Sequence, residues 1–132
     1  MDFSQLSQKL AKEINAQHTE YDSKYSVFIV PLKDERFQTV IARVIDHPKF
    51  NKEVVKITSK ICFVTEAINY QLVLEGSAEF VHTRFIVEEE LLKAEASFFY
   101  DSASESIMKE MILEVANISD DWEFKITGKD NF

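Results

Sequence analysis

The residue types best suited to chemistry gather near the end of the chain, where carboxylates follow one another closely at Asp120, Asp121, Glu123 and Asp130. Paired carboxylates can act as general acid and base when burial sets their pKa values apart. More often, such a cluster forms a solvated helix face. We therefore predict no catalytic residue here. The alternative hypothesis is a small ligand-binding domain or enzyme with a pocket near this acidic helix end, drawing also on His82.

The histidines and the single cysteine lack the neighbours that metal binding or nucleophilic catalysis requires. His18, His47 and His82 are separated by 29 and 35 residues, and none has a second ligand at a metal-binding interval. Cys62 lies in a predicted strand without an adjacent activating base. The sequence also lacks GxGxxG, Walker A, GxSxG, HExxH and CxxC motifs. We expect structural roles for these residues, and neither a metal nor a cofactor.

Composition predicts one globular domain over residues 1–132, with 15 basic against 23 acidic residues and a net charge of −8. This charge argues against nucleic acid as a partner and favours a basic one. A lone cysteine suits a reducing compartment. The polar N-terminus does not resemble a signal peptide, and no apolar run approaches a membrane span. We therefore expect a cytoplasmic protein that binds no membrane.

Hydrophobic spacing predicts a helix from Asp2 to about His18, capped by Asp2 or Ser4, with an apolar stripe of Phe3, Leu6, Leu10 and Ile14. Three strands should follow, at 25–30, 37–46 and 54–65. Pro31 suggests that the first of these strands lies at a sheet edge. In the third strand, alternation places four apolar residues on one face: Val55, Ile57, Ile61 and Phe63.

The segment 66–80 fits both a strand and a helix, and periodicity alone leaves both open. Strands at 81–87 and 91–100 should form a hairpin around the acidic turn 88–90. A last helix, with Ser102 at its capping box, should end at Gly128. Its apolar stripe comprises Ile107, Met111, Val115, Ile118, Trp122 and Ile126.

Two stretches resemble a known family. Residues 74–80 read LEGSAEF and lead into RFIV at 84–87, while residues 114–123 read EVANISDDWE. Together with the order of elements, these stretches resemble the YbjN family and, more broadly, the type III secretion chaperone-like fold. The resemblance implies an α+β fold with a five-stranded antiparallel sheet packed by helices, in the order α-β-β-β-α-β-β-α. It also implies a helix within 66–80, a homodimer and no enzymatic activity.

These observations favour a non-enzymatic protein-binding module, which holds a segment of a partner protein or acts in regulation. Adding a strand at an exposed sheet edge and filling apolar pockets would provide the affinity. The strand from Tyr25 to Val30 is the candidate edge. Alternatively, the first helix simply covers its own sheet. The candidate partner-binding residues are Phe3, Leu6, Leu10, Val27, Ile29 and Trp122.

Overall fold

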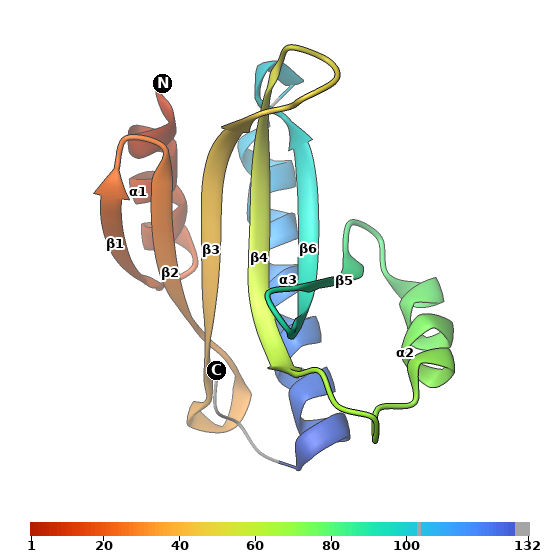
Figure 1. Cartoon of the computed structure of the whole chain (residues 1–132). Helices are drawn as coiled ribbons and strands as arrows, with labels where there is room; N and C mark the ends of the chain where they lie inside the picture. Colours follow the sequence, from red (N-terminus) through yellow and green to blue (C-terminus); the bar gives the residue numbers. More distant parts are fainter. Residues whose placement is uncertain (103, 129–132) are drawn as a thin grey trace.

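An antiparallel sheet backed by helices forms the protein, as the computed structural model shows (Figure 1). The structure describes residues 1–102 and 104–128, which hold three α-helices and six strands. The helices are α1 (Phe3–Glu13), α2 (Tyr70–Gly76) and α3 (Glu105–Thr127). The strands are β1 (Gln17–Asp22), β2 (Tyr25–Pro31), β3 (Phe37–Asp46), β4 (Glu53–Phe63), β5 (Arg84–Glu88) and β6 (Leu91–Phe99). The predicted α+β class is confirmed.

The sheet contains one more strand than predicted, and its strand order is β1-β2-β3-β4-β6-β5. The additional strand is β1, which occupies the end of the predicted first helix. Asp2 caps α1 as expected, its carboxylate accepting a hydrogen bond from the Gln5 amide at 2.8 Å. The helix ends at Glu13, and Asn15 adopts a left-handed φ of 57° that turns the chain back. The observed order is therefore α-β-β-β-β-α-β-β-α.

The prediction that Tyr25–Val30 lies at the sheet edge is wrong. β2 pairs with β1 on one side and with β3 on the other. Pro31 sits at the end of β2, opposite Phe37, where its missing donor does not interrupt the ladder. The edge strand is β1, whose side chains are almost all exposed and polar.

Alternation along β4 holds until a bulge near its end. Val55, Ile57 and Ile61 are buried as predicted, but Phe63 is 64% exposed. The register with β6 shifts between Lys60 and Cys62, and this shift moves Phe63 to the solvent side while burying Cys62. The expectation that Phe63 shares the face of the other three is therefore corrected.

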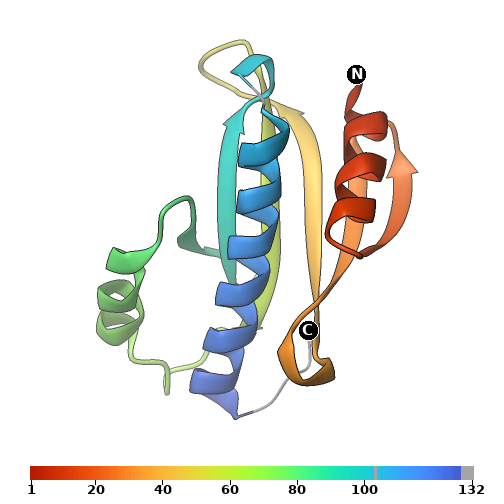
Figure 2. The same cartoon turned by 180° about the vertical axis from the view of Figure 1, so that it is seen from behind.

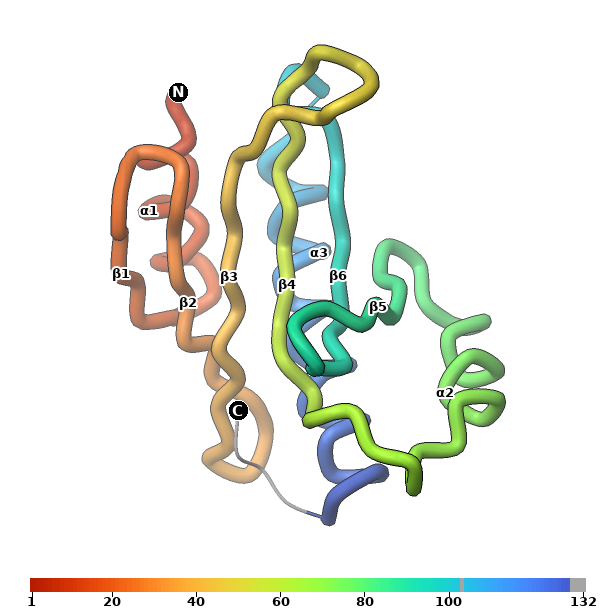
Figure 3. Tube along the Cα trace, in the orientation of Figure 1, coloured from red at the N-terminus to blue at the C-terminus, as the bar shows by residue number. Residues whose placement is uncertain are grey.

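The ambiguous segment 66–80 contains α2 and no strand. Asn69 caps this helix by accepting a hydrogen bond from the Leu72 amide at 3.1 Å. The following hairpin of β5 and β6 forms as expected, and both Glu89 and Glu90 adopt left-handed φ values in its turn. The tube trace in Figure 3 shows α2 standing beside the β5 end of the sheet rather than across it.

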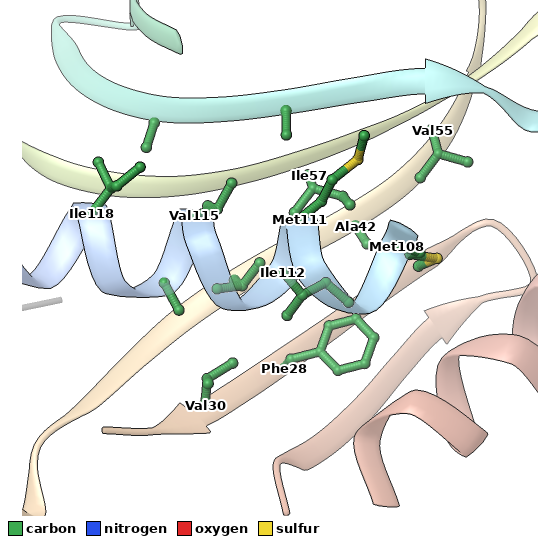
Figure 4. Close-up of a cluster of buried hydrophobic side chains, with 14 of the residues drawn as sticks. Phe28, Val30, Ala42, Val55, Ile57, Met108, Met111, Ile112, Val115 and Ile118 are labelled. Carbon is green, nitrogen blue, oxygen red and sulfur yellow. The ribbon is translucent and has the colours of Figure 1, made fainter. Parts of the chain in front are cut away.

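Helix α3 supplies seven residues of the hydrophobic core, more than any other helix. Ser104, not Ser102, caps it, and Gly128 ends it with a left-handed φ of 73°, as predicted. Ile107, predicted in its apolar stripe, is 38% exposed instead. Figure 4 shows the apolar side chains of α3 packed on strands β2, β3 and β4. The labelled residues are Phe28, Val30, Ala42, Val55, Ile57, Met108, Met111, Ile112, Val115 and Ile118.

Helices α1 and α3 cover the same side of the sheet (Figure 2), and their buried residues join one hydrophobic cluster. No helix of the described residues lies over the opposite side, which faces the viewer in Figure 1. We call that opposite side the open face. Register and alternation place these central side chains on it: Tyr25, Val27, Ile29, Ile41, Arg43, Lys56, Thr58, Glu95 and Ser97.

Candidate functional site

The three partner-binding candidates on α1 lie inside the protein's own core. Phe3, Leu6 and Leu10 are 3%, 7% and 0% exposed, and they pack against the sheet beside α3. Because the first helix covers its own sheet, these side chains offer no surface to a partner. This observation corrects the prediction for the three residues.

The two candidates in β2, Val27 and Ile29, lie on the open face. Ile29 is 36% exposed, and Val27 is half-buried. Their place on this face follows from the alternation of β2, whose other side carries the fully buried Phe28. They are accessible to a partner through the face of the sheet rather than through its edge.

Trp122, the sixth candidate, lies where α3 meets α2 and β5. Its ring is 8% exposed and stands edge-on to Phe85, with 5.3 Å between ring centroids. Lys125 places its ammonium 4.7 Å from the centre of the indole. A Cβ on Gly76 would come within 2.2 Å of the ring, so only glycine lets α2 approach this closely. Trp122 therefore holds α2 against the body of the protein.

Beside this contact lies an apolar hollow of about 520 Å³ between α2 and the C-terminal turns of α3. Leu72 lines this hollow and is 57% exposed. A second hollow of about 360 Å³ also has Trp122 in its lining. The lining of the larger hollow consists of Ala67, Ile68, Asn69, Leu72, Val73, Trp122, Lys125 and Ile126. The α2–α3 hollow can receive apolar side chains of another molecule.

Glu114 of α3 fixes the connection that follows α2. Its carboxylate accepts hydrogen bonds from the backbone N–H of Val81 at 3.0 Å, from that of His82 at 2.7 Å and from the Thr83 hydroxyl at 2.6 Å. Burial raises the pKa of Glu114, but these donors, led by Thr83, outweigh it and hold the pKa below its ordinary value. The connection is thereby held in place by an ionised carboxylate.

The carboxylates at the acidic end of α3 differ in their surroundings. Asp120 is engaged by Arg36, whose guanidinium donates to both carboxylate oxygens at 2.8–3.1 Å. Glu123 is almost fully buried, whereas Asp121 is exposed. Asp130 lies outside the described residues. Arg36 is the partner that sequence reasoning missed, since no spacing rule links the β2–β3 connection to the last helix.

The histidines and the cysteine occupy separate places. The His82 ring lies 3.2 Å from a carboxylate oxygen of the exposed Glu110. His18 packs near Phe28. Cys62 is buried in β4, and burial, followed by the charge of Glu123, raises the pKa of its thiol. Among residues 1–102 and 104–128, no three His, Cys, Asp or Glu side chains are arranged to hold a metal ion.

Comparisons with family models and curated proteins do not assign this chain to a family. No family model matches the sequence, and no curated protein matches it either. Within the described part of the chain, no helix combines the length and the apolar character needed to cross a bilayer. The fold and the surfaces above are therefore the basis for any statement about function.

Proposed function

We propose that this protein is a non-enzymatic protein-binding module that holds a segment of a partner protein, as the resemblance to YbjN and type III secretion chaperones suggests. The observation that supports this proposal most is the α2–α3 hollow with Leu72 in its lining. Exposed apolar surface that lines a concavity is typical of sites that receive another molecule. Two carboxylates of α3, Asp120 and Glu114, have structural partners, which is consistent with binding rather than catalysis.

The partner's apolar side chains would enter the hollow and contact Leu72 and the edge of Trp122. Lys125 lies at the same hollow and supplies a charge at its rim. Recognition there combines an apolar pocket with one basic group, a combination that suits a short segment more than a broad flat surface.

The test is affinity capture from the lysate of the native host, with the tagged protein as bait and mass spectrometry as readout. The variant Leu72→Asp places a charge at the hollow, and Val87→Asp is its matched control. Val87 is also aliphatic, is 58% exposed against 57% for Leu72, and lies on β5. We expect Leu72→Asp to lose the captured partner and Val87→Asp to keep it. Capture of no specific partner, or equal losses in both variants, would contradict the proposal.

A homodimer is a second part of the proposal. Tyr70 and Leu74 lie one turn apart on α2 and are 37% and 64% exposed, so they form a short apolar stripe that a second copy would cover. Light scattering over a range of concentrations should give a dimeric mass for the parent protein and a lower mass for Leu74→Asp. A monomeric mass at every concentration would exclude the dimer.

A further inference from the structure

The open face carries charge of the opposite sign to the chain as a whole. The net charge of the protein is −8, yet the residues of β3 to β6 on this side of the sheet include five basic and only two acidic ones, of which Lys93 and Glu95 are buried. The basic residues are scattered along the sequence and become neighbours only through strand pairing. They are Arg43, Lys56, Lys60, Arg84 and Lys93, and the acidic residues are Glu88 and Glu95.

Two of these cations stand directly opposite each other on neighbouring strands. Arg43 of β3 pairs with Lys56 of β4 in the antiparallel register. Like charges in this position destabilise a sheet, because their side chains are held about 5 Å apart. Arg43 is exposed and makes no ion pair within 4 Å among the residues that the structure describes.

The acidic residues of the face neutralise this pair only in part. Glu95 is held by Arg84, and its carboxylate is 4.0 Å from the Lys56 ammonium. Glu88 accepts a hydrogen bond from Lys93 at 3.0 Å. That hydrogen bond is the main reason why the pKa of Glu88 lies below its ordinary value. Burial opposes this shift, and the charges of Lys93, Arg43 and Lys56 add to it. The two carboxylates are thus shared among Arg84, Lys56 and Lys93, and the excess of positive charge lies at Arg43, beside Lys56.

The side chains beside the two cations indicate which other groups a ligand of this surface would carry. The row across the sheet reads Asp22, Tyr25, Arg43, Lys56 and Ser97, so a phenol and a hydroxyl flank the two cations and can also donate hydrogen bonds. The carboxylate of Asp22, at the end of the row, accepts a hydrogen bond from the Lys24 backbone N–H at 2.7 Å. The next row begins with Val27 and Ile41, which are aliphatic. The Tyr25 ring is already in edge contact with Tyr21, with centroids 5.2 Å apart. Aliphatic side chains beside paired cations suit an acidic peptide better than nucleobases, which require free aromatic faces.

We propose that the open face binds an acidic segment of a partner protein, with Arg43 and Lys56 receiving its carboxylates and Val27 and Ile41 contacting its apolar side chains. This inference rests on the proposed protein-binding function but uses a surface separate from the α2–α3 hollow. A partner's carboxylate would relieve the repulsion between the two cations. Relief of this repulsion, which is present in the free protein, would add to the free energy of binding.

The probe is a fluorescein-labelled peptide of alternating valine and glutamate, titrated with the full chain and followed by fluorescence anisotropy. We expect binding that weakens as salt rises, because exposed charges are screened. Arg43→Glu should weaken binding by at least about tenfold, the loss expected when one charge-assisted hydrogen bond is removed. The matched control is Lys12→Glu, which makes the same change of charge at an exposed residue of α1. It should leave the affinity within about twofold.

Misfolding does not explain the expected loss, because Arg43→Glu replaces a repulsive pair with an attractive one. Arg43→Gln provides a second, neutral variant and should lie between the parent and Arg43→Glu. Absence of peptide binding, or equal weakening by Lys12→Glu, would overturn the proposal. So would tighter binding of a labelled oligothymidylate, which would make nucleic acid the occupant. Self-association of the protein that Arg43→Glu abolishes would make a second copy of the chain the occupant of the open face.

The two proposals fail separately. If Leu72→Asp loses the captured partner while the acidic peptide does not bind, the open-face inference is wrong and the proposed function stands. If the peptide binds and depends on Arg43 while Leu72→Asp keeps the captured partner, the role of the α2–α3 hollow is wrong instead.

Discussion

The two faces of the sheet are built by the same strands and differ in almost every physical respect. On the side covered by α3, alternate residues of β3 and β4 are closely buried: Val40, Ala42 and Ile57 are 0% exposed. On the open face, the residues between them include Arg43 and Lys56, which retain contact with solvent. One side excludes water, and the other carries an excess of like charge.

This difference separates stability from recognition. Burial of apolar area is the dominant favourable term in folding, and here it is concentrated under α1 and α3. On the open face, Lys93 and Glu95 are buried, but Arg43 is exposed and contributes little burial, so its charge can be unfavourable in the isolated protein. The comparison predicts that substitutions on the two faces differ in size and even in sign.

The largest effect should come from Phe28→Ala on the covered side. Phe28 is 0% exposed, so its removal should cost about 3–5 kcal/mol of unfolding free energy in urea denaturation. The adjacent residue provides the control, because Ile29 points to the open face and is 36% exposed. Ile29→Ala should cost less than about 1 kcal/mol. Equal losses at the two positions would show that the faces do not differ as described.

An intermediate effect should come from Glu114→Ala, which removes an acceptor on α3 while leaving the sheet intact. Three donors would lose their partner, at a cost of about 1–3 kcal/mol. Hydrogen exchange should show faster exchange in α2 and the 81–83 connection but not in β3 or β4. The control is Glu110→Ala, one turn earlier on α3 and exposed, which should change stability by less than about 0.5 kcal/mol. Faster exchange throughout the sheet would contradict this local role.

The same carboxylate predicts a dependence on pH. Because the pKa of Glu114 is lower in the folded protein than in the unfolded chain, its contribution is fully present above the unfolded value of about 4.3. The contribution is lost as pH falls through the folded pKa. Acid titration of stability should therefore be shallower for Glu114→Gln than for the parent. Superimposable titration curves would show that Glu114 is not linked to folding.

The smallest effect, and one of opposite sign, should come from Arg43→Glu on the open face. Replacing the cation opposite Lys56 by an anion should stabilise the free protein by about 0.2–1 kcal/mol at low salt. The gain should shrink as salt is added. Arg43→Lys, which keeps the repulsion, should be nearly neutral. Destabilisation by Arg43→Glu would show that the row is not repulsive in the folded protein.

Periodicity in the sequence determined much of the architecture. The alternation in 37–46 and 54–65 predicted β3 and β4, and the apolar spacing of the last helix predicted α3. These predictions succeed because side-chain periods of two and 3.6 follow from local backbone geometry. Gly128 likewise marked the end of α3, since a left-handed φ is a local property of glycine.

The missed strand shows where local patterns end. Gln17–Asp22 is polar and almost fully exposed, so it has no alternation to detect. It becomes β1 because the edge of β2 offers unpaired backbone donors and acceptors, and pairing with them does not depend on side-chain hydrophobicity. For the same reason the strand 25–30 could not be recognised as internal.

The candidate surfaces depended on tertiary structure alone. The pairing of Arg43 with Lys56 follows from the register of β3 and β4 across the intervening loop, and a shift of one residue would have placed one of the two cations on the other side. The α2–α3 hollow likewise brings Leu72 to Trp122 over a separation of 50 residues. The sequence determined which elements form and which of their sides are apolar, because both are set by local geometry. Packing decided which charges and hollows share a surface, because only the closed fold brings distant side chains into contact.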